Sequence, residues 1–451
     1  MRERLLTITE AAEQLSAGET TSRNLVETCL ARAADDIGEG ARVYLTTYAD
    51  RARADADHVD QMRANGWAVP TFAGVPISIK DLFDVAGEVT RAGSKVFDAD
   101  QPAIDDAPAI QRLRAAGFII IGKTNMTEFA YSGLGMNAHF GTPLSPYDRA
   151  TGRIPGGSSS GGAVSVADGM AIATIGTDTG GSCRIPAAFC GIVGFKPTST
   201  RVPKEGAVPL SKTMDSVGPL ANSVSCCALL DSVLVGNGGE NVTKRANDTI
   251  RIGVIDNYVT NGMETAVGVA IDAALSRLSA AGVGVDHLTI PELEDLPHIN
   301  RMGGIVGAEA YAFHKPYAET RANLYDPWVF SRFDAGKAQS AADFIEVIET
   351  RAQVRVAVAN RVQGFDALAL PTVAITPPAL ADLADPDVSN ATNQMTLRNT
   401  AVGNFLDRPS ISIPCHAPDA APVGFMLMGH TDADRALISV ATGLENLIRG
   451  R

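Results

Sequence analysis

The chain has 451 residues, and its 38 lysines and arginines against 51 aspartates and glutamates give a formal net charge of −13. Apolar residues make up 45% and charged residues 20%, which is ordinary for a globular protein and argues against a disordered chain. The acidic balance disfavours sequence-independent nucleic-acid binding, because such proteins need a basic face to displace counterions. We therefore expect no nucleic-acid partner.

The N-terminal residues 1–6 contain no apolar core long enough for a signal peptide, and no run reaches the roughly 18 apolar residues of a membrane span. The six cysteines form no Cys-x-x-Cys pair and show no metal-type spacing with histidine. Scattered cysteines in a long chain are typical of buried thiols in a reducing compartment. The sequence thus predicts a cytoplasmic protein with no membrane contact and no metal site.

The first 65 residues are predicted to be helical. Thr7 and Glu10 have the spacing of a capping box, and an apolar stripe follows them. A second helix is expected to start near Ser22 and a third to cover residues 49–64.

After residue 70 the pattern changes to alternating strands and helices. Residues 72–79 and 118–121 form short apolar runs typical of strands, with a predicted helix over 107–116 between them. A strand, a helix and a strand at this spacing form a β-α-β unit, which favours an α/β sheet.

The same alternation returns in the second half of the chain. Helices are expected over 266–281 and through most of 295–362, and strands over 250–255, 283–288, 367–370, 410–413 and 423–428. No internal repeat, low-complexity tract or linker divides the chain, so one α/β domain with helical insertions is the simplest interpretation.

Two short motifs match known patterns without their usual context. Residues 117–124 fit G-x-x-x-x-G-K-T, but their central Phe and three Ile favour a strand over a phosphate-binding loop. Residues 157–161 fit the G-x-S-x-G nucleophile elbow, but the turn-rich residues before them do not form the required strand. The composition leaves a Ser-His-Asp site open, with its histidine among His287, His298, His314, His416 and His430.

Three segments carry the most specific pattern in the chain. They are Gly74–Asp81, the Gly/Ser run Gly156–Gly162, and Gly176–Pro186 with its Asp-Thr-Gly-Gly-Ser-x-Arg-x-Pro order. Together they resemble the amidase signature family of serine hydrolases. Further matches lie at 122–129, 191–198, 409–415 and 422–425. The resemblance covers 70–220 and 400–445 well, and 225–395 only loosely.

The resemblance implies an α/β fold of a single domain, 1–451, with a central mixed β-sheet flanked by helices. Its parts would be an N-terminal helical segment (1–65), the signature core (70–220), a variable region that shapes the substrate pocket (225–395), and closing strands with a C-terminal helix (400–451).

The resemblance also implies a Ser-Ser-Lys triad. Ser182 would be the nucleophile, Lys80 the base, and Ser158 the bridging serine, which in the family follows a cis peptide bond. The other implied positions are the oxyanion-hole residues Thr179, Gly180 and Gly181, and the substrate-lining residues Ala130 and Tyr131.

Elementary chemistry supports such a triad. A serine hydroxyl needs a base within reach, and lysine is a base only when neutral, although its usual pKa is about 10.4. Burial lowers that pKa, and the apolar residues 75–79 are suited to bury Lys80. On composition alone Lys123 and Lys196 compete for this role. Asp178 and Arg184 are expected to pair structurally.

The resulting hypothesis is an amidase that hydrolyses a carboxamide C–N bond of a small molecule through a serine acyl-enzyme, with no cofactor. Two alternatives stay open: the glutaminase subunit of a tRNA-dependent amidotransferase, which would need partner subunits, and a non-catalytic binding protein of the same fold. The sequence leaves open whether the substrate is an amide, a urea or an anilide. Arg321 or Arg332 would suit an acidic substrate, although most arginines are solvated. The oligomeric state is open between a monomer and a homodimer.

Overall fold

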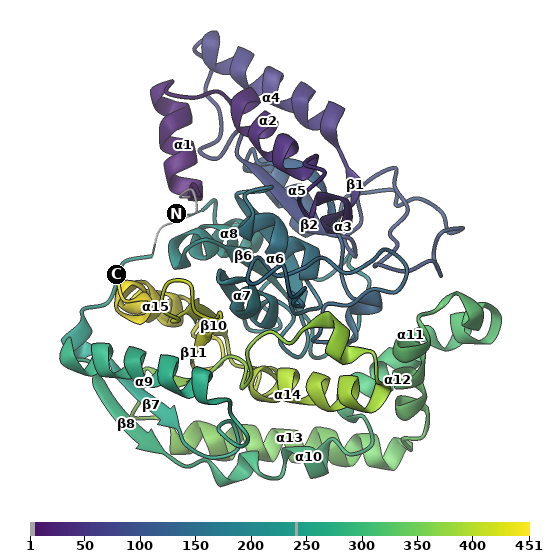
Figure 1. The fold of residues 1–451 in the computed structure, drawn as a ribbon, viewed down its shortest axis with the longest axis vertical. Coiled ribbons are helices and arrows are strands. Elements are labelled where there is room, and N and C mark those ends of the chain that lie inside the picture. Colours follow the sequence, from purple (N-terminus) through teal and green to yellow (C-terminus); the bar gives the residue numbers. More distant parts are fainter. Residues whose placement is uncertain (1–4, 240–241) are drawn as a thin grey trace.

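The computed structural model describes residues 5–239 and 242–451. Its centre is one 11-stranded sheet with the order β1-β3-β2-β4-β6-β5-β10-β11-β9-β7-β8 (Figure 1). The strands are β1 (Tyr44–Thr47), β2 (Pro76–Lys80), β3 (Ile119–Thr124), β4 (Ala173–Asp178), β5 (Val193–Lys196), β6 (Ser216–Ala221), β7 (Arg251–Ile255), β8 (Gly284–Leu288), β9 (Ala367–Pro371), β10 (Ser410–Pro414) and β11 (Gly424–Met428).

The predicted α/β fold with a mixed sheet is confirmed. The β-α-β unit consists of β2, α5 (Pro108–Ala115) and β3, and the two strands pair in parallel. Strand β4 pairs in parallel with β2 and antiparallel with β6. Because β3 begins at Ile119, the segment that matched a phosphate loop is a buried strand, as its β-branched residues indicated.

The three predicted N-terminal helices are present as α1 (Ile8–Ala17), α2 (Ser22–Ala33) and α4 (Ala49–Ala64), which lie together at one end of the molecule in Figure 1. Thr7 and Glu10 form the expected capping box at α1. The remaining helices of the first half are α3 (Gly40–Val43), the 3₁₀ turn η1 (Glu128–Ala130), α6 (Ser160–Ala167), α7 (Arg184–Cys190) and α8 (Val224–Val235).

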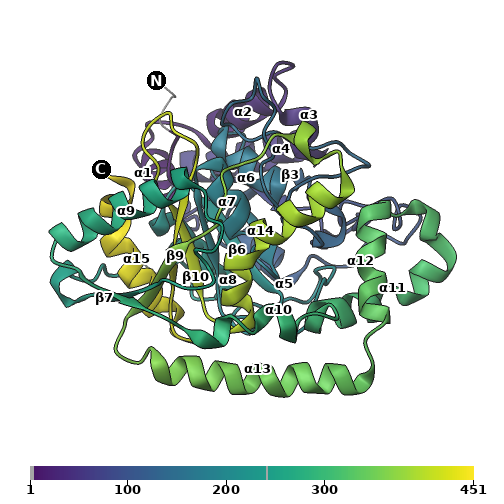
Figure 2. The same ribbon diagram turned by 60° about the horizontal axis from the view of Figure 1, so that its bottom comes forward.

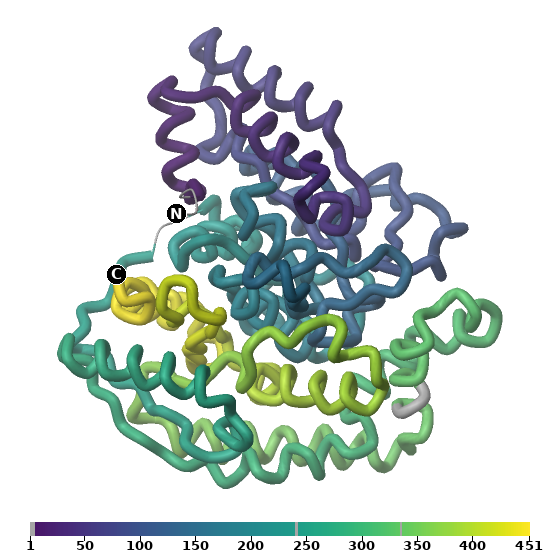
Figure 3. Tube along the Cα trace, viewed as in Figure 1, coloured from purple at the N-terminus to yellow at the C-terminus, as the bar shows by residue number. Residues whose placement is uncertain are grey.

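The second half contributes α9 (Thr265–Ala280), α10 (Leu296–Ile299), α11 (Gly304–Arg321), α12 (Pro327–Lys337), α13 (Ala341–Arg361), α14 (Pro386–Phe405) and α15 (Asp434–Arg449). The predicted helical region 295–362 is thus confirmed. Figure 2 shows α13 running along one edge of the molecule, and Figure 3 shows the α11–α12 pair projecting at the side. The Asp326 amide, just before α12, donates to Glu128 Oε2 at 2.8 Å, so this pair reaches the η1 segment.

The sheet is buried on both faces. In β11, Phe425 and Leu427 join one core cluster with residues of α8 and α15, whereas Met426 and Met428 join another with residues of α13 and α14. This two-sided burial explains why the strands appear in the sequence as continuous apolar runs. All six cysteines are buried, as expected. Within the described ranges, no helix is both long and apolar enough to span a membrane.

Candidate active site

Lys80 and the segment that contains Ser182 lie at the carboxyl ends of two parallel strands. Lys80 is the last residue of β2, and Asp178 is the last residue of β4. The two strands pair with Ile79 beside Ile175, so their ends reach the same edge of the sheet. Parallel strands commonly present functional residues at this edge. Here the edge brings Lys80 next to the segment that follows β4.

Lys80 has no solvent-exposed surface. Its Nζ donates to Ser158 Oγ at 2.8 Å and to Thr177 Oγ1 at 2.9 Å. Burial lowers the pKa of Lys80 to about 8, although the carboxylates of Asp215 and Asp178 oppose this shift. The sequence analysis missed Thr177, because nothing in the sequence shows that its side chain turns toward the lysine.

The segment around Ser158 is held by backbone contacts. The Gly157–Ser158 peptide bond is cis, as the resemblance implies. The Gly157 amide donates to the Gly133 carbonyl at 2.7 Å, and the Ser158 carbonyl accepts from the Thr127 amide at 3.1 Å. A Cβ atom on Gly157 would lie 2.6 Å from the Gly135 nitrogen, so only glycine fits here.

Ser182 lies in the turn before α7 and is 3% exposed. Its carbonyl accepts from the Ser159 amide at 3.3 Å, so the two predicted catalytic serines lie in adjoining segments. Gly181 has a φ of 140°, and a Cβ there would lie 2.2 Å from Thr400 Oγ1. Thr400 Oγ1 donates to the Gly180 carbonyl at 2.6 Å, which fixes the predicted oxyanion segment against α14.

A buried carboxylate holds Thr179. The Thr179 hydroxyl donates to Asp215 Oδ1 at 2.5 Å, and Asp215 Oδ2 accepts from the amides of Leu210 and Ser211 at 3.0 and 3.1 Å. Burial raises the pKa of Asp215 to about 6. The sequence analysis missed Asp215, because the contact depends on the pairing of β4 with β6.

Asp178 and Arg184 form the structural pair that the sequence analysis expected. Both side chains are fully buried, and Arg184 Nη2 and Nε lie 2.8 and 3.0 Å from the two oxygens of Asp178. Asn404 completes the network by donating to Asp178 Oδ1 at 2.9 Å. Burial alone would raise the pKa of Asp178, but the adjacent Arg184 cation lowers this pKa to about 2. This carboxylate is therefore ionised and held in place.

The competing lysines have other partners. Lys123 Nζ lies 3.7 Å from Asp81 Oδ1, and Lys196 Nζ donates to the Pro197 carbonyl at 2.7 Å. The histidines considered for a Ser-His-Asp site also bond elsewhere, as in the contacts of His287 with Asp256 and of His314 with Tyr325. Among these candidates, Lys80 is the one in contact with Ser158.

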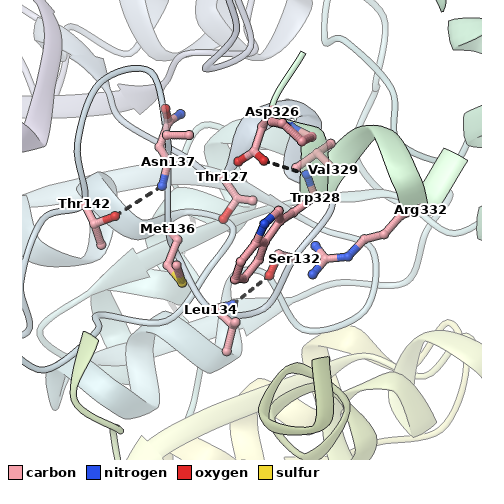
Figure 4. A pocket seen from close by; sticks show the side chains of 12 residues that line it. Thr127, Ser132, Leu134, Met136, Asn137, Thr142, Asp326, Trp328, Val329 and Arg332 are labelled. Carbon is pink, nitrogen blue, oxygen red and sulfur yellow. Dashed lines mark hydrogen bonds between the residues drawn. The ribbon is translucent and has the colours of Figure 1, made fainter. Parts of the chain in front are cut away.

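Ala130 and Tyr131 lie at the end of η1. Ala130 is buried with a φ of 60°, and the Tyr131 ring packs against Phe333 of α12 at a centroid distance of 5.4 Å. The Tyr131 carbonyl accepts from Arg332 Nη1. Beside this segment lies a cavity of about 240 Å³, whose lining includes Thr127, Ser132 and Arg332 (Figure 4).

Comparisons with known proteins identify the family of this chain. The profile of the Amidase family matches residues 24–438. The chain is 34% identical over 450 residues to the 2-amino-5-chloromuconic acid deaminase of Comamonas testosteroni, covering 98% of this chain and 96% of that protein. It is 33% identical over 481 residues to one subunit of the glutamyl-tRNA(Gln) amidotransferase of Anaeromyxobacter sp. (strain K), with the same coverage of 98% and 96%.

The fold comparison gives the same result. A crystal structure of an amidase matches with a TM-score of 0.88 at 31% sequence identity, covering 98% of this chain and 99% of that one. The sequence match and the shared fold both extend over nearly the whole chain. This chain therefore belongs to the amidase signature family of hydrolases, which act on carbon–nitrogen bonds.

Proposed function

We propose that this chain hydrolyses the C–N bond of a small carboxamide through an acyl-enzyme on Ser182. One observation carries the proposal: the fully buried Lys80 amine lies 2.8 Å from Ser158 Oγ, in surroundings that lower its pKa to about 8. A lysine whose pKa is near the working pH supplies enough neutral amine to act as a general base.

In the first half of the reaction, neutral Lys80 takes the proton of Ser158 Oγ while Ser158 Oγ takes the proton of Ser182 Oγ. Ser182 Oγ then bonds to the carbonyl carbon, and the C=O electron pair moves to oxygen. The amides of residues 179–182 donate to this oxyanion. When the adduct collapses, the C–N bond breaks, and the proton held by Lys80 returns through Ser158 to the leaving nitrogen.

In the second half, water attacks the acyl carbon and the same relay takes its proton. The ester bond to Ser182 breaks and Ser182 Oγ regains a proton, so an amide and water become a carboxylic acid and ammonia or an amine. Bridging through Ser158 allows Lys80 to serve both steps, since a base that accepts a proton in one step donates it in the other.

The test is turnover of a panel of small amides by the purified chain and by Ser182→Ala, with Ser276→Ala on the exposed side of α9 as a matched control. Loss of turnover in Ser182→Ala alone supports the proposal. Wild-type turnover by Ser182→Ala on every amide that the parent cleaves would reject it. The name of the Comamonas relative describes loss of an amino group from an acid, so acidic substrates belong in the panel.

A second candidate is the glutaminase role within a tRNA-dependent amidotransferase, favoured by the 33% identity to a subunit of the Anaeromyxobacter enzyme. This role requires partner subunits. Robust hydrolysis of a small amide by the isolated chain would count against it, and copurification with a kinase-like partner would count for it. The remaining alternative, a non-catalytic binding protein, predicts that a fluorophosphonate probe leaves Ser182 unlabelled.

A further inference from the structure

We propose that the substrate of this site carries a carboxylate in addition to its amide, and that Arg332 binds that carboxylate in the cavity beside Ser132. The inference rests on the proposed amidase function of Ser182. It specifies the chemical class of the substrate: a short acid amide, in preference to a neutral amide or a long apolar chain.

Arg332 carries a charge that no direct ion pair within the described part of the fold neutralises. Its Nη1 donates to the Tyr131 carbonyl, and no carboxylate of the described residues forms an ion pair with it. Arg321, the other arginine that the sequence suggested, lies 2.7 Å from Asp100 and also donates to the Val96 carbonyl. Arg321 is thus paired directly within the fold, whereas Arg332 has only the more distant carboxylate of Asp326 nearby and keeps donors for a ligand.

Arg332 is partly buried. Figure 4 shows Arg332 reaching from α12 toward Ser132 on the cavity wall. Removing a cation from water is costly unless an anion or several acceptors compensate, and one backbone carbonyl compensates only in part. A carboxylate is the partner that best fits the planar fork of arginine donors.

A second donor without a partner faces the same cavity. Thr127 is 2% exposed, and its Oγ1 has no hydrogen-bond partner among the described residues. Asp326 also lines the cavity, but its Oδ1 accepts the Trp328 amide at 2.8 Å as the N-cap of α12. The volume of about 240 Å³ is below the roughly 300–1,000 Å³ of pockets for drug-sized ligands and suits a short acid.

Two contacts connect the lining of the cavity to the segments that hold the proposed catalytic residues. The Thr127 amide donates to the Ser158 carbonyl at 3.1 Å, so one residue contacts both the triad and the cavity. On the other side, the Ile185 side chain packs against both Gly133, which follows Ser132, and Gly181 of the oxyanion segment. We therefore place the amide of the substrate at Ser182 and its carboxylate at Arg332, in one bound molecule.

The experiment compares each acid amide with a neutral partner of equal length, such as succinamate with butyramide and glutaramate with valeramide. In the wild type we expect a higher kcat/KM for the acids. Arg332→Gln is expected to lower the acid-to-neutral ratio by about 10- to 100-fold, the usual loss for a charged hydrogen bond. Arg332→Lys should restore part of the ratio. Arg321→Gln is the matched control and should leave the ratio unchanged.

A second readout requires no turnover. Succinate and glutarate are expected to slow fluorophosphonate labelling of Ser182 in the wild type, but not in Arg332→Gln. The corresponding neutral diamides, succinamide and glutaramide, should not slow the labelling of either protein. An unchanged acid-to-neutral ratio in Arg332→Gln, or labelling that neither diacid slows, would overturn the inference and leave the amidase proposal standing. A wild-type chain that neither labels nor turns over would reject both.

Discussion

The Thr179 hydroxyl donates to the Asp215 carboxylate at 2.5 Å, although the two residues lie 36 positions apart in the sequence. The Ser211 amide also donates to Asp215, and the Ser211 hydroxyl donates to Glu309 of α11. A chain of contacts, buried at Asp215 and partly buried at Glu309, thus links the proposed oxyanion segment to a helix of the variable region. This link makes Asp215 a positioning residue for the proposed reaction.

We therefore expect Asp215→Asn to lower kcat by about 10- to 100-fold, somewhat less than the direct loss of an oxyanion donor. The pKa of Asp215 is raised to about 6, so its carboxylate is protonated as the pH falls through that value and becomes a poorer acceptor for Thr179. The plot of log kcat/KM for the wild type should steepen below pH 6, and the plot for the variant should not. An unaltered kcat in Asp215→Asn would contradict this role.

Lys80 is expected to set the main pH dependence of the proposed reaction. Because only the neutral amine is a base, kcat/KM should rise with pH and level off above the Lys80 pKa of about 8. Lys80→Met should lower kcat/KM by about 10²- to 10⁴-fold, the usual contribution of a general base. Lys196→Met is the control, since burial also lowers the Lys196 pKa to about 8 but its amine bonds to Pro197. If Lys196→Met removed the transition near pH 8, the assignment to Lys80 would be wrong.

Thr177→Val tests how the base is held. Thr177 Oγ1 accepts a 2.9 Å hydrogen bond from Lys80 Nζ, which favours the charged amine. Valine has nearly the same shape but no acceptor, so the kinetic pKa should fall below that of the wild type. The plateau should also fall, because Lys80 loses a contact that orients it. A kinetic pKa that stays the same or rises would show that this contact does not act on Lys80.

The two glycines before Ser182 are expected to respond differently to alanine. A Cβ on Gly181 would lie 2.2 Å from Thr400 Oγ1, at a φ of 140°. A Cβ on Gly180 would meet only Leu397, at 3.4 Å. Gly181→Ala should therefore lower the melting temperature and abolish labelling of Ser182, whereas Gly180→Ala should keep the wild-type melting temperature. Equal melting temperatures for the two variants would contradict the described backbone.

The buried Asp178–Arg184 pair is expected to matter chiefly for stability. Arg184→Met leaves Asp178 ionised and without its cation in the core, which costs about 3–5 kcal/mol. Urea unfolding should show this loss, with Arg251→Met at an exposed ion pair with Asp286 as the control of small effect. If the free energy of unfolding falls no more in Arg184→Met than in the control, the core neutralises Asp178 by other means.

Most of the local structure could be predicted from the order of the amino acids. The Thr7–Glu10 spacing predicted the start of α1, and the apolar runs at 118–121 and 423–428 predicted β3 and β11. Such features depend on neighbouring residues, so their signal is continuous in the sequence. The roles predicted for Lys80, Ser158 and Ser182 come instead from motif order and from the resemblance to a family.

Which groups meet in space depends on the folded chain. Thr177, Asp215 and Thr400 contact the predicted site residues through strand pairing and through helix α14. Thr177 lies within the Gly176–Pro186 motif, but the motif does not show its contact with Lys80, and no motif includes Asp215 or Thr400. The same holds for the two arginines of the variable region, which look alike in the sequence. In the folded chain Asp100 lies beside Arg321, and a cavity lies beside Arg332. The sequence does not show this difference, because each contact joins segments that are far apart in the chain and meet only after folding.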